Sequence, residues 1–141
     1  MERADGERPE KRIFKEVVVH LDFKGAPPTL PFLKDLIAFI GTKFEKLVTG
    51  ILFEMEDCFP YDGNLRPLRG PNVYSPDDIA EVLDLMRKHD LKFIPLVQTF
   101  GHLEFALKRE RFSHLRETAN NFTSVCPLQE ESLELVCSMI D

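Results

Sequence analysis

The chain has 141 residues, which is enough for one domain of ordinary size. Hydrophobic residues make up 43% of the sequence and charged residues 30%, a balance that is typical of a globular protein and argues against a disordered one. The net charge is −6, and no basic stripe interleaved with aromatic residues occurs, so nucleic acid is not an expected partner.

The N-terminal segment, MERADGERPEKR, is charged and contains no apolar run. We therefore expect no signal peptide, no membrane span and no membrane partner. Residues 1–15 are predicted to form a flexible tail. The three cysteines, Cys58, Cys126 and Cys137, share no metal-ligand spacing. They suit a reducing compartment, which predicts a cytoplasmic location, with the nucleus as a second possibility.

The first two predicted elements are a strand and a helix. EVVVHLDF, residues 16–23, predicts a strand because its centre is a β-branched run. TLPFLKDLIAFIG, residues 29–41, predicts a helix because its apolar side chains recur at helical spacing. Thr29 can cap this helix, and Gly41 is expected to end it.

The same alternation continues along the chain. LVTGILFE, residues 47–54, predicts a strand, and SPDDIAEVLDLMRKHD, residues 75–90, predicts a helix capped by Ser75. LKFIPLV, residues 91–97, predicts a third strand. Pro95 should cause a bulge or an irregular hydrogen-bond pattern in it, because proline cannot donate to a sheet ladder.

A last helix is predicted over PLQEESLELVCSMI, residues 127–140. The alternation of elements predicts an α/β fold with parallel strands and right-handed crossovers. The strand ends lie 32 residues apart from Asp22 to Glu54, and 44 apart from Glu54 to Gln98. A (β/α)8 TIM barrel averages about 31 residues per unit, so the spacing favours about three units of such a barrel. A doubly wound sheet stays an open alternative, although no glycine-rich phosphate loop follows a strand.

Polar side chains follow each predicted strand. Because the carboxyl ends of parallel strands open on one side, we expect these side chains to meet at one rim, where such folds bind ligands. One such cluster often only marks the end of a strand, but three in succession favour a site. The residues are His20, Asp22, Lys24, Glu54, Glu56, Asp57, Gln98, His102 and Glu104.

Two other kinds of chemistry are weighed against these residues. Metal binding is one, since His20 and Asp22 point to the same side of a strand and could join His102. No HExxH motif or cysteine pair supports it, so we expect no metal. A cysteine nucleophile is the other, but Cys58 lies in a loop and no nucleophile elbow occurs.

Glycoside hydrolysis by paired carboxylates is a third alternative. Asp77–Asp78 and Glu130–Glu131 are best explained as charges at helix starts, which leaves Glu56–Asp57. Five aromatic residues near the rim could pack against a sugar ring, although such residues more often belong to the core. They are Phe23, Phe59, Tyr61, Phe100 and Phe105.

Four stretches carry a resemblance to a known family: HLDFKGAPP, FEMEDCFPYDG, YSPDDIAEVLDLMRKHDLKFIPLVQTFGHLEF and HLRE. From about residue 16 to its end, the chain resembles the β-N-acetylhexosaminidases of glycoside hydrolase family 20. The resemblance implies a (β/α)8 catalytic domain, of which residues 16–141 form the N-terminal part. It implies hydrolysis of terminal N-acetylgalactosamine or N-acetylglucosamine from β-glycosides, with no cofactor. The resemblance is also compatible with a homodimer in the complete enzyme.

The mechanism that the resemblance implies is retaining and substrate-assisted. The acetamido oxygen of the sugar attacks the anomeric carbon, an Asp orients that acetamide, and the neighbouring Glu protonates the leaving oxygen. In the family this Asp–Glu pair follows a fourth strand, and the 141 residues do not contain it. Glu56–Asp57 has the opposite order and follows the second strand. We therefore expect no activity from this chain alone, and an inactive truncated product or binding fragment is the alternative interpretation.

Several residues match positions of the family motifs. His102, in the Gly-His after the third strand, resembles a histidine that supports the catalytic Asp through hydrogen bonds. Asp22 matches an acid of the first strand, and Lys24 stands near the position where other members carry a sugar-binding Arg. Glu56 and Asp57 also match family positions, but the resemblance assigns them no role. The remaining supporting or substrate-binding candidates are Gln98 and Glu104.

Overall fold

The structure is a computed structural model that describes residues 13–141. The tail predicted over residues 1–15 lies outside the described residues except at its end. There, residues 13–15 are exposed and form no helix or strand.

Within residues 13–141, strands alternate with helices in the predicted order. In chain order the elements are β1 (Val18–Asp22), α1 (Leu30–Lys43), β2 (Gly50–Glu54), the 3-10 helices η1 (Glu56–Cys58) and η2 (Gly63–Leu68), α2 (Pro76–Lys88), β3 (Lys92–Leu96), α3 (Glu104–Leu107), the 3-10 helix η3 (Glu110–Leu115) and α4 (Glu130–Ile140). The three predicted strands and three predicted helices are confirmed, whereas α3 and the 3-10 helices were not foreseen. None of the described helices is long and apolar enough to cross a bilayer.

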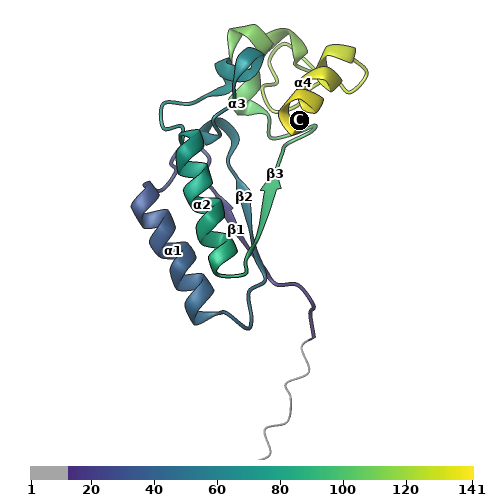
Figure 1. The fold of residues 1–141 in the computed structure, drawn as a ribbon. Helices are drawn as coiled ribbons and strands as arrows, with labels where there is room; N and C mark the ends of the chain where they lie inside the picture. The colour runs from purple at the N-terminus through teal and green to yellow at the C-terminus, as the bar shows by residue number, and fades with distance from the viewer. Residues whose placement is uncertain (1–12) are drawn as a thin grey trace, which may run out of the picture.

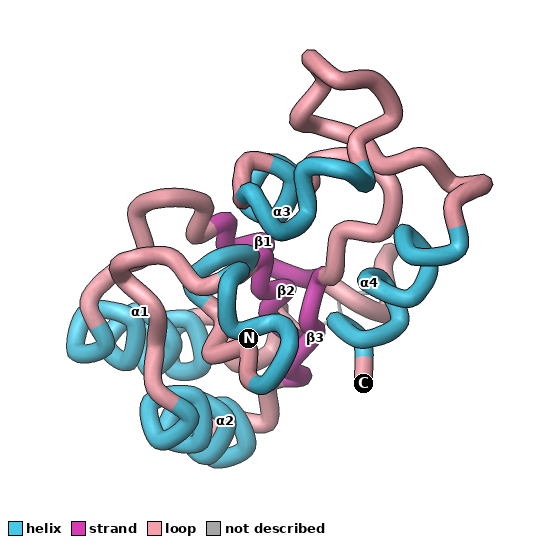
Figure 2. The backbone as a smooth tube through the Cα atoms, turned by 90° about the horizontal axis from the view of Figure 1, so that it is seen from above, coloured by secondary structure: helices cyan, strands magenta, loops and turns pink. Residues whose placement is uncertain are grey.

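The three strands form one parallel sheet in the order β1-β2-β3. Figures 1 and 2 show α1 and α2 on one face of this sheet, while the later helices gather beyond the carboxyl ends of the strands. The strand ends are level, because Asp22 pairs with Glu54 and Glu54 pairs with Leu96. The predicted α/β class and parallel pairing are confirmed. The sheet of residues 13–141 is open, so the structure shows no closed barrel.

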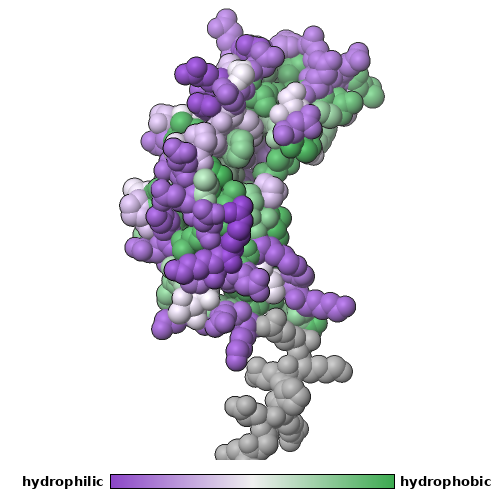
Figure 3. Space-filling model, viewed as in Figure 1, coloured by the Kyte–Doolittle hydropathy of each residue, from purple (hydrophilic) through white to green (hydrophobic). Residues whose placement is uncertain are grey.

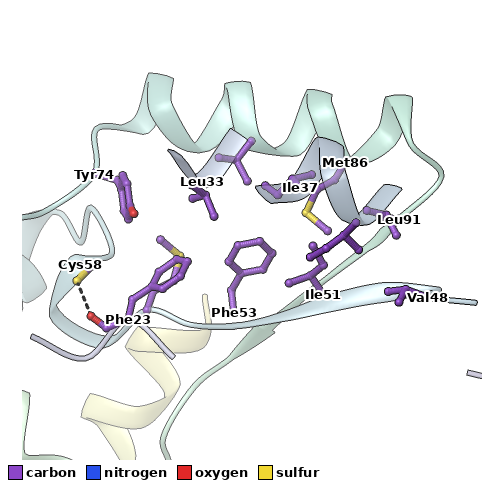
Figure 4. Close-up of a cluster of buried hydrophobic side chains, with 13 residues drawn as sticks. Phe23, Leu33, Ile37, Val48, Ile51, Phe53, Cys58, Tyr74, Met86 and Leu91 are labelled. Carbon is purple, nitrogen blue, oxygen red and sulfur yellow. Dashed lines mark hydrogen bonds between the residues drawn. The ribbon is translucent and has the colours of Figure 1, made fainter. Parts of the chain in front are cut away.

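The main core lies between the sheet and the helix pair α1 and α2 (Figure 4). Phe53 is 1% exposed at its centre; its ring stacks on Phe93 at 4.8 Å and meets Phe23 edge-on at 5.8 Å. Burying a side chain of this kind stabilises the fold by roughly 1.5–3 kcal/mol. The helices contribute Leu33, Ile37, Ile40, Val82 and Met86.

The second face of the sheet has little cover. Alternate residues of a strand point to opposite faces, so Val18, Leu52 and Ile94 share the face away from α1 and α2. Val18 is 39% exposed, and neither Leu52 nor Ile94 belongs to a buried cluster. Parallel sheets are normally covered on both faces. Val18, Leu52 and Ile94 are therefore less covered than the strand residues of most parallel sheets.

Gly41 does not end α1, and that prediction was wrong. The helix continues to Lys43, and Gly41 is buried inside it. A Cβ on Gly41 would lie 2.5 Å from the side chain of His89, at the end of α2. The glycine thus serves the close approach of two helices, which is a tertiary requirement that local sequence does not reveal.

The two predicted helix caps differ in the structure. Ser75 accepts from the Asp78 N–H at 3.1 Å, and the Asp78 carboxylate accepts from the Ser75 N–H at 2.8 Å, so α2 begins with a complete capping box. Thr29 occupies the N-cap of α1, but its side chain makes no capping hydrogen bond. The expected role of Ser75 is confirmed and that of Thr29 is not.

Pro95 causes no bulge, contrary to the prediction. The register of β2 and β3 runs unbroken, with Phe53 opposite Pro95. The Lys92 N–H donates to Thr49 on the β2 side, so the peptide groups of residues 93 and 95 face away from β2. Proline therefore stands where its missing N–H is on the open edge of the sheet, the position that tolerates it.

A second core lies beyond the strand ends, where the long segment after β3 packs on η2 and α4. Its fully buried members include Leu68, Leu103 and Leu107. Among the α4 side chains, Leu135 and Val136 are buried in this core, whereas Leu133 and Ile140 are each 61% exposed.

A hollow of about 570 Å³ lies between α4 on one side and α2 with the end of the sheet on the other. Ile79 and Leu83 of α2, Phe93 of β3, and Met139 and Ile140 of α4 lie around it. Figure 3 shows hydrophobic surface on both sides of this hollow. An apolar groove beside an unpaired strand edge favours association with other chains.

The isolated 141-residue chain is predicted to self-associate through this groove. Ile140→Lys should shift the sedimentation coefficient toward the monomer, because it places a charge at the mouth of the groove. Ile13→Lys is the matched control, since Ile13 is 89% exposed and precedes β1. Sedimentation of the unsubstituted chain as a monomer, with one sharp thermal transition, would contradict the prediction.

Candidate functional site

Glu54, the last residue of β2, is the centre of a polar network at the strand ends. Its side chain is buried, and it accepts three hydrogen bonds, from a residue of β1, from the turn after β1 and from the segment after β3. Lys24 Nζ lies 2.5 Å from Oε1, Gln98 Nε2 lies 2.7 Å from the same oxygen, and His20 Nε2 lies 2.9 Å from Oε2. We call His20, Asp22, Lys24, Glu54 and Gln98 the rim network.

The pairing of β1 with β2 builds this network. His20, Asp22 and Glu54 all point to the face away from α1 and α2. The Phe23 N–H donates to the Glu54 carbonyl at 3.0 Å, which extends the pairing one residue past β1. The Lys24 N–H donates to Asp22 Oδ1 at 3.0 Å, and this turn directs the lysine back over the strand ends.

One ammonium group serves three carboxylates. Besides Glu54, Lys24 Nζ lies 3.0 Å from Asp22 Oδ2 and 3.6 Å from Glu56 Oε1. Burial opposes the charge on Lys24, but its bonds to Glu54 and Asp22 outweigh that effect and raise its pKa. Burial likewise opposes the charges of Glu54 and Asp22, but bonds from Lys24 outweigh it and lower the pKa of each carboxyl. The three groups are therefore ionised together at neutral pH.

Glu56 differs from these carboxylates. It opens η1, is 7% exposed, and has a φ of 46°, which is left-handed backbone. Its Oε1 is buried and has no hydrogen-bond partner among the described residues. Burial raises the pKa of Glu56 to about 7, although the Lys24 ammonium opposes the shift. Glu56 is thus a carboxyl that changes charge near neutral pH.

Two predicted candidates lie apart from the rim network's hydrogen bonds. Asp57 turns toward the loop instead: its carbonyl accepts from the Gly70 N–H at 2.7 Å, and a Cβ on Gly70 would come within 2.2 Å of its carboxylate. Glu104 begins α3 and acts on Glu56 only through its charge. Asp57 therefore has a structural explanation, and Glu104 contributes negative potential.

His102 is exposed and has a φ of 57°. None of the hydrogen bonds of residues 13–141 involves its imidazole, and its loop is fixed by backbone bonds instead. The Leu103 N–H donates to Thr123 at 3.0 Å, and the Val125 N–H donates to Phe100 at 3.2 Å. The imidazole is therefore displayed at the surface without a partner in this part of the chain, and its supporting role stays a prediction.

The aromatic candidates divide between core and surface. Phe23 and Tyr61 are buried, and Phe105 packs against the second core. Phe59 and Phe100 are 37% and 51% exposed, so they keep rings available for contact. Phe59 also meets Tyr61 edge-on at 4.9 Å, which fixes its orientation.

Neither alternative chemistry finds support in the geometry. Cys58 is buried, donates to the Phe23 carbonyl at 3.5 Å (Figure 4), and burial raises its pKa to about 12. A thiol with that pKa is a poor nucleophile at neutral pH. Among residues 13–141, no three His, Cys, Asp or Glu side chains lie close enough together to hold a metal ion.

The rim network has the donors and acceptors needed to bind a polar ligand. Carboxylate oxygens of Asp22 and Glu54 accept from hydroxyl or amide donors, while Lys24 and Gln98 donate. Sequence reasoning found these residues from their positions at strand ends. It also placed Tyr61 among the aromatic residues near the rim, and burial, together with the charge of Glu56, raises the pKa of this tyrosine to about 12.

Comparison with known proteins gives a relative for most of the chain. Hexosaminidase D of Bos taurus is 50% identical over 125 residues, which make up 88% of this chain and 35% of that protein. Hexosaminidase D of Homo sapiens is 47% identical over 129 residues, which make up 91% of this chain and 26% of that protein. The chain is homologous to hexosaminidase D. The predicted resemblance is confirmed, and it relates the chain to a glycoside hydrolase.

The match to hexosaminidase D is partial in length. The chain spans about a third of the bovine protein and about a quarter of the human one. No protein-family model matches the chain. Homology therefore covers nearly all of this chain but only a portion of each hexosaminidase D.

Glu56→Gln is predicted to make stability less dependent on pH. The pKa of Glu56 is about 7 in the fold and near its ordinary value of 4.5 when unfolded. The folded state therefore holds an extra proton between these values, and stability falls as pH rises from about 4.5 through 7. Relative to the parent, the variant should gain roughly 2–3 kcal/mol of unfolding free energy between pH 4.5 and 8, since one pKa unit is worth about 1.4 kcal/mol.

Urea unfolding at the two pH values measures this difference. Glu45→Gln is the matched control, because Glu45 is exposed before β2 and its neutralisation should not change the pH dependence. Parallel stability curves for the parent and Glu56→Gln would show that Glu56 ionises normally.

Proposed function

We propose that residues 16–141 supply the first three βα units of a (β/α)8 β-N-acetylhexosaminidase. The proposed reaction removes terminal N-acetylgalactosamine or N-acetylglucosamine from β-glycosides with retention of configuration. The observation that carries the proposal is the 50% identity to hexosaminidase D over 125 residues. Identity of this degree over nearly the whole chain supports a shared fold and a shared site.

The geometry of the sheet supports the barrel. A barrel has helices outside and apolar strand side chains inside. Here α1 and α2 cover one face, and Val18, Leu52 and Ile94 leave an apolar second face open. The unpaired edge of β3 and the groove beside α2 offer room for a further strand and helix.

The rim network supports a carbohydrate ligand. Sugar hydroxyls both donate and accept, and the strand ends present both kinds of partner within one cluster. We propose that Asp22, Lys24 and Gln98 contact the sugar and that His102 orients the catalytic Asp. That Asp and its neighbouring Glu act in the mechanism implied by the family, with the Glu as general acid. They would be contributed by the further length that the relatives possess.

A graft tests the proposal directly. The 125 aligned residues replace the matching segment of bovine hexosaminidase D, and hydrolysis of an aryl β-N-acetylhexosaminide is measured. We expect kcat/KM within about tenfold of the bovine parent, which corresponds to a loss below about 1.4 kcal/mol of transition-state stabilisation. The isolated 141-residue chain should show no turnover, because general acid catalysis alone contributes about 10²–10⁴-fold.

The graft must be folded for its activity to be informative. Circular dichroism and a cooperative thermal transition like that of the bovine parent establish this. A folded graft without activity would contradict the proposed function. Turnover by the isolated chain near the parental rate would show that the catalytic pair had been wrongly placed.

His102→Ala in the active graft is predicted to lower kcat by roughly tenfold to a hundredfold while KM changes little. A residue that orients a catalytic carboxylate acts mainly in the transition state, and each tenfold is worth about 1.4 kcal/mol. His114→Ala is the matched control, since His114 is exposed and bonds Glu131 at 2.8 Å. An unchanged kcat with a lower melting temperature would assign His102 a structural role only.

A further inference from the structure

Glu56 carries two costs that the fold does not explain. Its φ of 46° is left-handed, a backbone conformation that is strained for a non-glycine residue. Its buried Oε1 makes no hydrogen bond within the described residues. Native structures rarely leave a buried polar atom unpaired, so such an atom calls for an explanation.

The positive φ of Glu56 is not the one that often ends a helix. Asp90 also has a positive φ, 54°, but it follows the end of α2, where the Leu91 N–H donates to Met86 at 3.0 Å in a common helix-ending motif. Glu56 instead begins a 3-10 helix, and its side chain points toward the charges of the rim network. The positive φ of Glu56 therefore does not belong to a helix end. It directs the Glu56 carboxyl group toward Lys24.

Lys24 is the group that this carboxyl faces. An ammonium has three N–H donors, and Lys24 directs its contacts to Glu54 at 2.5 Å and Asp22 at 3.0 Å. Glu56 Oε1 lies at 3.6 Å, just beyond hydrogen-bond distance. If Lys24 moved toward Glu56, Glu54 would still accept from Gln98 and His20. A move of the lysine toward Glu56 would therefore not leave Glu54 without donors.

Charges from every neighbouring element bear on Glu56. The carboxylates Asp22 of β1, Glu54 of β2 and Glu104 of α3 oppose its ionisation, whereas Lys24 favours it. Tyr61, in the loop after η1, is neutral and buried beside it. Burial adds to the opposition, so the pKa of Glu56 is raised to about 7. A small change of pH therefore changes the charge of this carboxyl.

We propose that Glu56 is a proton-controlled positioning residue for Lys24. When Glu56 is protonated, Lys24 stays on Glu54 and Asp22, as in this structure. When Glu56 ionises, it draws the ammonium toward its own Oε1 and weakens the contact to Asp22. The carboxylate of Asp22 is then freer to accept from a ligand. This inference goes beyond the proposed function and holds whether or not the chain takes part in hydrolysis.

Titration followed by NMR tests the proposal in the full chain. With ¹³C-labelled Glu and Lys, the side-chain carboxyl of Glu56 should titrate with a midpoint near pH 7. The ε-carbon of Lys24, assigned by its loss in Lys24→Arg, should shift with the same midpoint. Glu56→Gln should abolish this step for Lys24, whereas Asp57→Asn, the matched control, should leave it unchanged.

In the NMR titration, either of two results would overturn the proposal: a Glu56 midpoint near 4.5, or a Lys24 step that survives in Glu56→Gln. Where the lines of the isolated chain are too broad, the same titration in the bovine graft decides. Crystals of that graft at pH 5.5 and pH 8.5 give a second readout. The Lys24–Glu56 separation should shorten from 3.6 Å to hydrogen-bond distance at the higher pH, and an equal separation in both would contradict the proposal. All these measurements stand apart from catalysis, so inactivity of the graft would not decide them.

Discussion

The parallel pairing of β1 with β2 is the constraint on which the site depends. It sets Asp22 directly opposite Glu54, and two carboxylates at adjacent strand ends repel one another unless a cation lies between them. Lys24 supplies that cation two residues after β1. The hydrophobic core below, centred on Phe53, holds the register that makes this arrangement possible. Packing on one face of the sheet thus determines how the charged groups Asp22, Lys24 and Glu54 are arranged at the carboxyl ends of the strands.

Two non-glycine candidate residues adopt a backbone conformation that favours glycine. Glu56 and His102 both have left-handed φ, where glycine would be less strained. Their side chains differ in setting, since Glu56 is buried beside Lys24 and His102 is exposed without a hydrogen bond among the described residues. Strain of this kind concentrates at functional positions. At Glu56 the backbone therefore points independently to the same rim as the polar side chains do.

The grouping of polar side chains in the rim network was predictable because it follows from topology. Parallel strands bring their ends together, so Asp22, Lys24 and Gln98 could be grouped from the sequence alone. The hydrogen bonds to Glu54 depend on exact register, which only the folded sheet defines. Gly41 was misjudged for a related reason: its role is set by His89, 48 residues away in the chain. The unpaired state of Glu56 depends on a 3-10 turn that no local pattern indicated.

Pro95 marks the open edge of the sheet in a way that matters for its neighbours. Its peptide nitrogen faces outward and has no hydrogen to offer. Any parallel strand that paired along this edge would place a carbonyl opposite residue 95 and find no donor there, whatever its register. Leaving that carbonyl unpaired in a nonpolar setting costs roughly 1–3 kcal/mol. The proline thus makes the open edge of β3 a weaker template for an added strand than a run of ordinary residues would be.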